Sequence, residues 1–188
     1  MATAKIKEYT GTEIISLAEA KQYLRIDFTA DDTYITELIK IARVQLLKDT
    51  NQPVVEQTIT EYFTKWPSYN IFYLQYAGKM SGSTLKFYND KGTTSTYTEG
   101  TEYKLINYMG NNTIEMIKTD TLDDRKNAIE IEYKVEPVSD DEIKPLKIAM
   151  YMLIQHFYDN RSQIAYGKVN EMPLAYKHII AQYKNYTW

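Results

Sequence analysis

The chain has 188 residues, a length that predicts one domain or one domain with an insertion. Its 22 basic and 25 acidic residues leave a formal charge of −3, which argues against a protein that wraps nucleic acid through a basic surface. Cysteine is absent and histidine occurs only twice, so a cysteine nucleophile, a thiolate metal site and a histidine-rich metal site are excluded. Tyrosine is abundant, with 18 Tyr against 5 Phe and 2 Trp, a composition that favours interfaces and half-buried sheets.

Targeting and membrane signals are not expected in this sequence. Residues 1–8 lack the apolar core of a signal peptide. The longest strongly apolar stretch, residues 148–158, is far shorter than the roughly 20 residues that a spanning helix needs. We therefore expect synthesis in the cytoplasm and no membrane partner.

The composition changes twice along the chain. Residues 1–53 are predicted to be an N-terminal helical part, residues 54–136 a β-rich insertion, and residues 137–188 a set of C-terminal helices. The predicted fold class is α+β. In this prediction the N-terminal and C-terminal helices pack as one small helical bundle, with an antiparallel β region inserted between them.

Two helices are predicted in the first region. Ser16 and Glu19 form a capping box at the start of a short amphipathic helix. Asp31 and Asp32 lie in the first turn of a second helix, which Asn51 and the following proline end. Its apolar stripe is Ile35, Leu38, Ile39, Ala42 and Leu46.

The middle region is predicted to be β structure with short turns. Turns are expected at 89–92 and 110–112, because Gly and Asn tolerate a positive φ. The clearest strand is 128–135, in which apolar and charged residues alternate and predict one buried face and one wet face. Further strands are expected at 54–66, 85–88, 103–106 and 113–118.

Two more helices are predicted in the last region. A second capping box, Ser139 to Glu142, opens a long helix that tolerates Pro145 near its start. A loop containing Gly167 follows, and Met172-Pro173 begins the last helix. The apolar face of the long helix is the strongest core pattern in the chain: Ile143, Leu146, Ala149, Met150, Leu153, Ile154 and Phe157.

No complete catalytic constellation is visible. The carboxylate pairs at 31–32 and 140–141 fit helix capping better than acid–base chemistry or metal binding, because both lie in a first helical turn. The polar-aromatic run 156–161 contains His156 and Asp159, which could form an oriented base. No Ser or Cys in the chain stands in a recognisable nucleophile context, such as the Gly-flanked Ser of a strand-to-helix elbow, and no phosphate loop or dinucleotide fingerprint occurs. We therefore expect a structural role for this run and no cofactor or metal. The sequence thus predicts a binding or assembly module and not an enzyme.

Both ends of the chain resemble a known family. Residues 15–27 and the acidic turn after them, followed by a longer helix ending near Thr50 and Pro53, look like the opening of phage head–tail connector proteins. The helix beginning at Pro145 and ending in the run 156–161 resembles the family's long helix with its terminal "hwYenR" signature. The resemblance covers about residues 14–66 and 139–184, while residues 67–127 match only as an extended β segment.

The resemblance implies a structural virion protein of a tailed phage or prophage, located at the head–tail junction. Such subunits dock as a ring onto the portal protein, extend the DNA channel and meet the tail or a stopper protein. They are monomeric until they meet the portal, and DNA passes without sequence-specific binding. The alternatives are another virion part, such as a stopper or tail-completion protein, and an Asp/His hydrolase.

The aromatic C-terminal tail is the predicted partner-binding site. Tyr183, Lys184, Tyr186 and Trp188 lie in a segment without a clear core periodicity. Aromatic side chains of this kind anchor in partner pockets. The other interpretation, in which the rings pack back on the protein's own surface, buries the same rings and stays open at this point.

Overall fold

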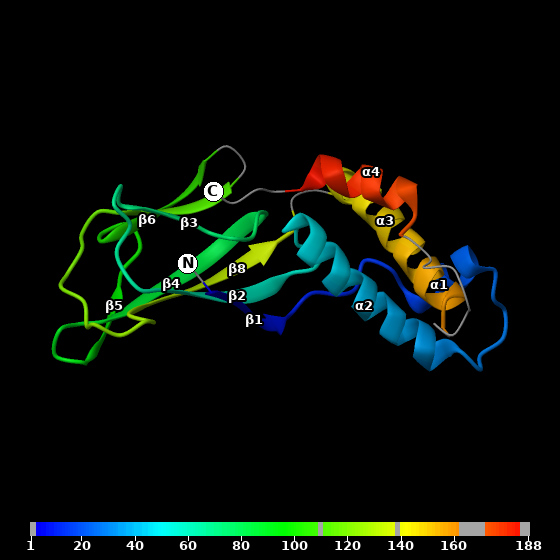
Figure 1. The fold of residues 1–188 in the computed structure, drawn as a ribbon, viewed down its shortest axis with the longest axis horizontal. Helices are drawn as coiled ribbons and strands as arrows, with labels where there is room; N and C mark the ends of the chain where they lie inside the picture. Colours follow the sequence, from blue (N-terminus) through cyan, green and yellow to red (C-terminus); the bar gives the residue numbers. More distant parts are fainter. Residues whose placement is uncertain (1–2, 109–110, 138–139, 162–171, 185–188) are drawn as a thin grey trace. The chain divides into compact units, whose positions relative to one another are not determined.

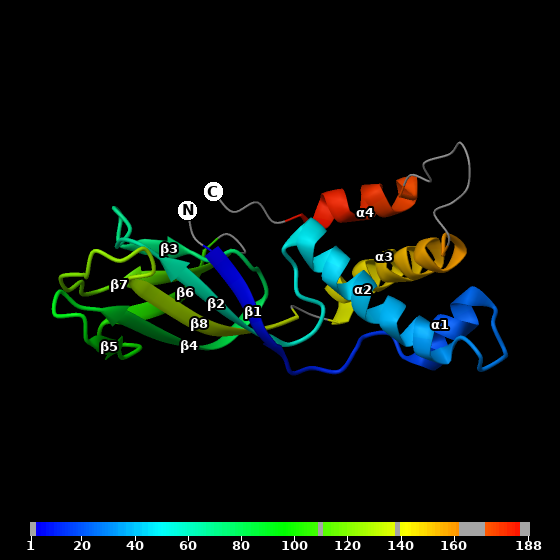
Figure 2. The ribbon, with the colours of Figure 1, turned by 60° about the horizontal axis from the view of Figure 1, so that its bottom comes forward.

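The computed structural model describes residues 3–108, 111–137, 140–161 and 172–184 of the chain. The chain divides into two compact units. The first, the β unit, is formed by residues 3–11 and 55–137 and contains all eight described strands. The second, the helical unit, is formed by residues 12–54 together with the described residues from 140 to 184, and contains the four described helices (Figures 1 and 2).

The larger sheet of the β unit has five strands in the order β1-β2-β8-β4-β5, and every neighbouring pair is antiparallel. Its strand β8 follows the alternation predicted at 128–135, with apolar residues buried and charged residues half-buried. The bounds are β1 Thr3–Tyr9, β2 Gln57–Phe63, β4 Lys79–Tyr88, β5 Thr94–Tyr97 and β8 Ile129–Glu136. The predicted turn at 89–92 is confirmed, because Gly92 has a φ of 73° and its N–H donates to the carbonyl of Asn89 at 2.8 Å.

The smaller sheet has three antiparallel strands in the order β3-β7-β6. These strands are β3 Ile71–Tyr73, β6 Tyr103–Tyr108 and β7 Asn111–Met116. Gly110, part of the turn predicted between the last two strands, lies outside the described residues.

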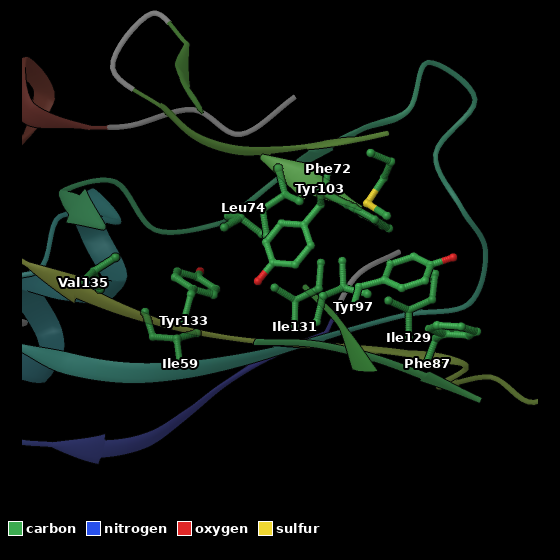
Figure 3. Packing of buried hydrophobic residues seen from close by; sticks show 13 residues of the cluster. Ile59, Phe72, Leu74, Phe87, Tyr97, Tyr103, Ile129, Ile131, Tyr133 and Val135 are labelled. Carbon is green, nitrogen blue, oxygen red and sulfur yellow. The ribbon is translucent and has the colours of Figure 1, made fainter. Parts of the chain in front are cut away.

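The core of the β unit lies between the two sheets, whose inward side chains point toward one another in Figure 3. Ile131 and Tyr133 of β8 and Ile59 of β2 come from the larger sheet, while Phe72 and Tyr103 come from the smaller one. All five are buried, so the period-two pattern of both sheets is explained by one shared apolar layer.

The helical unit contains four helices in the described ranges. They are α1 Leu17–Leu24, α2 Asp32–Thr50, α3 Asp140–Asp159 and α4 Leu174–Tyr183. The capping box of Ser16 and Glu19 is confirmed at the start of α1, and Asn51 ends α2 in the left-handed conformation with a φ of 55°. Ser139 and Gly167 lie outside the described residues. None of the helices in the described ranges is long and apolar enough to cross a membrane.

Helices α2 and α3 pack against each other through the apolar residues that the sequence singles out. Ile35, Leu38 and Ala42 of α2 are buried, as are Leu146 and Leu153 of α3. Helix α4 contacts both α3 and α2, but Tyr176 is its only fully buried residue.

The predicted fold class is wrong, because the helices are not N-terminal and C-terminal groups that flank one β region. Strand β1 comes before the first helix and pairs with β2, so a strand begins the part of the chain expected to be helical. The strands also form two sheets rather than one region. Strand β1 has Ile6 as its only large aliphatic residue, and its order comes from pairing with β2, about fifty residues away, which no local pattern reports.

Candidate functional site

The predicted C-terminal site is only partly within the described chain. Tyr183 is the last residue of α4 and is half-buried, and Lys184 follows it in an extended conformation and is exposed. Tyr186 and Trp188 lie outside the described residues. Of the four predicted residues, only Tyr183 and Lys184 are described. The partner-binding role of all four stays a prediction.

Helix α4 exposes an apolar surface that the sequence did not single out. Leu174 is 82 % exposed, and a shallow hollow beside it is lined by Leu174, Ala175, Lys177 and His178. On its inner side, the Tyr176 hydroxyl donates to Asp49 of α2 at 2.5 Å. Burial raises the pKa of Tyr176 and the hydrogen bond to the Asp49 carboxylate raises it further, so this tyrosine stays a neutral donor. Tyr176 thus anchors the inner side of α4, while Leu174 in its first turn is exposed.

A polar cluster joins the end of α3 to the start of α2. The guanidinium of Arg161 contacts both carboxylate oxygens of Asp31, at 3.2 and 2.5 Å, and the Tyr158 hydroxyl donates to the same carboxylate at 2.6 Å. The guanidinium also lies over the rings of Tyr34 and Tyr158, 4.6 and 4.0 Å from their centroids. The hydrogen bonds from Arg161 and then Tyr158 hold the pKa of Asp31 below its ordinary value. This arrangement is a fork-shaped ion pair stacked on aromatic rings.

The capping role predicted for the carboxylates at 31–32 is therefore wrong. Asp31 stands at the N-cap position of α2 but its side chain makes no capping hydrogen bond. Asp32 forms an ion pair with Lys21 at 2.6 Å. Arg161, 130 residues away, binds the Asp31 carboxylate in place of the local backbone, because its guanidinium offers a full positive charge and two hydrogen bonds, whereas a cap offers single bonds from neutral N–H groups. Helix α3 begins at Asp140 as expected, and nothing is described of the side chains at 140–142.

The run 156–161 forms structural contacts, as expected from the missing nucleophile. The amide of Asn160 donates to the backbone carbonyl of His156 at 2.6 Å, and the His156 ring packs edge-on against Phe157 with 5.8 Å between centroids. Tyr158 and Arg161 are engaged with Asp31. Across the described ranges, no three His, Asp or Glu side chains gather into a cluster that could hold a metal ion.

A second exposed patch lies on α1 and α3. The rings of Tyr23 and Tyr151 stack with 4.8 Å between centroids, and both line a shallow hollow with Glu19 and Gln22. At its rim, Lys147 donates to Glu19 at 2.7 Å. The pKa of Glu19 falls to about 2, chiefly through the hydrogen bond from Lys147 and then those from Ser16. The sequence marks Glu19 as a capping residue, but only the fold brings Lys147 to it.

The smaller sheet of the β unit also has apolar side chains on its outer face. Tyr73 is 42 % exposed and Ile106 37 %, and Ile117, just beyond β7, is 51 % exposed. The outer face of the larger sheet is different, because it carries ion pairs such as Lys7–Glu132 and Lys134–Glu56. The two sheets therefore differ in the chemistry of their outer faces.

Comparison with known proteins agrees with an assembly role. The model of the family described as phage gp6-like head–tail connector proteins matches residues 14–104 of the chain. No curated protein matches the sequence. The match begins at residue 14, where the resemblance predicted from the sequence also begins, and extends into the β unit. It does not include residues 139–184, the second part of the predicted resemblance.

Solved structures with a similar fold come from gene transfer agent particles. A chain in the neck of an empty particle computed with C6 symmetry is 14 % identical, with a TM-score of 0.70 and coverage of 100 % of this chain and 97 % of that one. A chain in the virion of a native particle is 16 % identical, with a TM-score of 0.74 and coverage of 98 % and 96 %. A chain in the neck of a native particle computed with C12 symmetry is 15 % identical, with a TM-score of 0.66 and coverage of 95 % and 97 %.

The described chain folds into two compact units, one made of strands and one of helices. The match of the phage gp6-like head–tail connector model to residues 14–104 confirms the resemblance predicted from the sequence.

Proposed function

We propose that this chain is the head–tail connector of a tailed phage or prophage, a structural virion protein at the junction of head and tail. The family match over residues 14–104 carries this conclusion. The likeness in fold to chains of particle necks, over almost the whole length of both chains, supports it.

In finer detail, we infer a ring of copies docked on the portal protein, which extends the DNA channel and meets the tail or a stopper protein. A heterologous contact between identical subunits closes into a ring when the rotation permits it. The exposed apolar surfaces at Leu174, at Tyr23 and at Ile106 offer contacts for such an assembly. DNA passes through the channel without sequence-specific binding, and the protein is made in the host cytoplasm.

The proposed partner contacts include the predicted residues of the C-terminus. Tyr183 is the last residue of α4 and Lys184 follows it, at the opposite end of the helix from the exposed Leu174, and Tyr186 and Trp188 come next in the sequence. Aromatic side chains at such positions supply much of the binding energy of an interface.

No observation favours the alternatives. A stopper or tail-completion protein would use similar exposed surfaces, but the family match is to connectors. The His156 ring packs edge-on against Phe157, and the neighbouring Asn160 and Arg161 make structural contacts with the His156 carbonyl and with Asp31. We therefore propose no enzymatic role.

Deletion of the gene from an inducible prophage tests the proposal. We expect filled or leaking heads that lack tails, because the head–tail junction cannot be completed. Electron micrographs of induced lysates give the measurement, and complementation from a plasmid provides the control. Normal tailed virions from the deletion strain would refute the connector function.

A further inference from the structure

The outer face of the smaller sheet carries apolar side chains and one charged residue of each sign. Tyr73 of β3 and Ile106 of β6 both pair with Thr113 of β7, so these three residues form one row across the face. Lys104 and Glu115 are paired in the register two residues further along, and residues two apart in a strand lie on the same side of a sheet. The apolar row therefore lies beside a row that holds a positive and a negative side chain.

The two charges of this face have no partner within the described residues. Lys104 and Glu115 are exposed, and neither forms an ion pair or a side-chain hydrogen bond there. The larger sheet is different, because every glutamate of β8 forms an ion pair with a lysine; these pairs are Lys86–Glu130, Lys7–Glu132 and Lys79–Glu136. An exposed apolar row beside unpaired charges is typical of a face that another protein covers and whose charges that protein pairs.

The loop between α1 and α2 presents the complementary groups. Arg25, Asp27 and Phe28 are exposed, the last at 51 %. Arg25 and Asp27 form no ion pair with any part of the chain that the structure describes. A base and an acid two residues apart match Glu115 and Lys104, and the aromatic ring beside them matches the apolar row.

The conformation of this loop is fixed by hydrogen bonds on both sides. The Ile26 N–H donates to the carbonyl of Lys21 at 2.9 Å, and the Asp32 N–H donates to the carbonyl of Thr29 at 3.1 Å. The side chains of Lys21 and Asp32 also form an ion pair at 2.6 Å. A loop already held in one conformation loses less entropy when it binds, so its exposed side chains can bind as a unit.

The turn at 89–92 is another candidate for the complementary surface. Asp90 and Lys91 are exposed there and form no ion pair among the described residues. However, none of the large apolar side chains that are exposed lies in this turn, whereas Phe28 directly follows Asp27. The α1–α2 loop is therefore the better match to the smaller sheet.

We propose that the α1–α2 loop of one copy binds the outer face of the smaller sheet of a neighbouring copy. Asp27 forms an ion pair with Lys104 in this contact. Arg25 forms a second ion pair with Glu115, while Phe28 packs against the apolar row. The contact joins two different surfaces, so it repeats from copy to copy and closes when the rotation permits. The proposal rests on the ring inferred under the proposed function and names the two surfaces that meet.

Cross-linking between two differently tagged copies tests the proposal. One copy carries Phe28→Cys and the other Ile106→Cys, and both are expressed in the induced deletion strain, whose lysate is treated with a short bismaleimide. The natural chain has no cysteine, so every cross-link within the protein joins two copies. We expect about tenfold more mixed dimer than from the matched control, in which Asp90→Cys replaces Phe28→Cys, because the contact raises the local concentration of one thiol near the other. No excess over this control overturns the proposal.

Charge reversal gives a second measurement with the same cross-link. Lys104→Glu in the Ile106→Cys copy should lower the yield of mixed dimer about tenfold, because it then faces Asp27 with a like charge. Asp27→Lys in the Phe28→Cys copy should restore the yield. Lys91→Glu, the control, should leave it unchanged, and Trp66 fluorescence shows that the β unit of each variant is folded. A yield that Lys104→Glu does not lower, or that Asp27→Lys does not restore, overturns the proposal.

The two proposals fail separately. Tailless heads from the deletion strain together with no excess of mixed dimer would refute the contact between loop and sheet and leave the connector function intact. Normal virions from the deletion strain would refute the connector function itself.

Discussion

Removal of one buried hydroxyl should destabilise the β unit measurably. Glu61 of β2 is 1 % exposed, and its carboxylate accepts hydrogen bonds from the Tyr133 hydroxyl and, at 2.8 Å, from the Gln75 N–H. Tyr133→Phe keeps the ring in the core and removes only the hydroxyl. A hydrogen bond to a charged group contributes about 1.5–3 kcal/mol, so we expect the free energy of unfolding to fall by about this amount at pH 7.

The loss of stability caused by Tyr133→Phe should depend on pH. Burial raises the pKa of Glu61 above its ordinary value of 4.5, and the hydrogen bond from Tyr133 opposes that rise. The folded state therefore binds the Glu61 proton more tightly than the unfolded state does, and the stability that this proton confers is lost as pH rises from 4.5 through the folded pKa. Without the tyrosine hydroxyl the folded pKa rises further. The penalty of Tyr133→Phe should thus be larger at pH 7 than at pH 4.

Urea unfolding followed by Trp66 fluorescence measures this effect. Trp66 stacks on Tyr97 in the β unit, and a Trp188→Phe background leaves it as the single tryptophan. With a slope of about 1–3 kcal/mol/M, a loss of about 1.5–3 kcal/mol should lower the midpoint by roughly 0.5–3 M. The matched control is Tyr62→Phe, which removes a hydroxyl from a half-buried tyrosine of β2. A Tyr133→Phe midpoint within experimental error of this control at pH 7 would refute the reasoning.

Two further predictions concern the core and the α1–α3 ion pair. Ile131→Ala should lower the free energy of unfolding of the β unit by about 2–5 kcal/mol, because the side chain is fully buried between the sheets; a loss below 1 kcal/mol in the same urea assay would contradict the packing described. Glu19→Gln should cost less than about 1 kcal/mol at pH 7, since the Glu19 side chain is 43 % exposed and its bond to Lys147 is screened. The folded pKa of Glu19 is depressed to about 2, so its contribution is present above 4.5 and disappears as pH falls toward 2. Thermal melts of variant and natural protein should converge in that range, and a constant difference from pH 7 to pH 2 would argue against the ion pair.

Local sequence signals predicted much of the secondary structure because their causes are local. The capping box at Ser16 needs only Glu19, three residues away, and the turn before β5 needs only Gly92. Strand β8 is readable because its alternation reflects one buried face. Strand β1 has no such pattern, since its order depends on pairing with β2.

The candidate surfaces were less predictable. The sequence pointed to the C-terminal aromatics, but it did not indicate that Leu174 is exposed at the start of α4. Exposure depends on what the rest of the chain leaves uncovered. The helical periodicity of 174–183 marks apolar positions without saying that only Tyr176 becomes fully buried.

The sequence by itself determined the types and approximate limits of most helices and strands, and the family resemblance that the comparison confirmed. Capping, turn formation and amphipathic periodicity depend on residues that are close together in the sequence, so they can be recognised from the sequence alone. Only the tertiary structure decided that Asp31 binds Arg161 rather than capping α2, and that the chain begins with a strand of a five-stranded sheet. In both cases the interacting residues are about fifty or more positions apart in the sequence. Which residues pair is then decided by the free energies of competing tertiary contacts, which no local pattern reports.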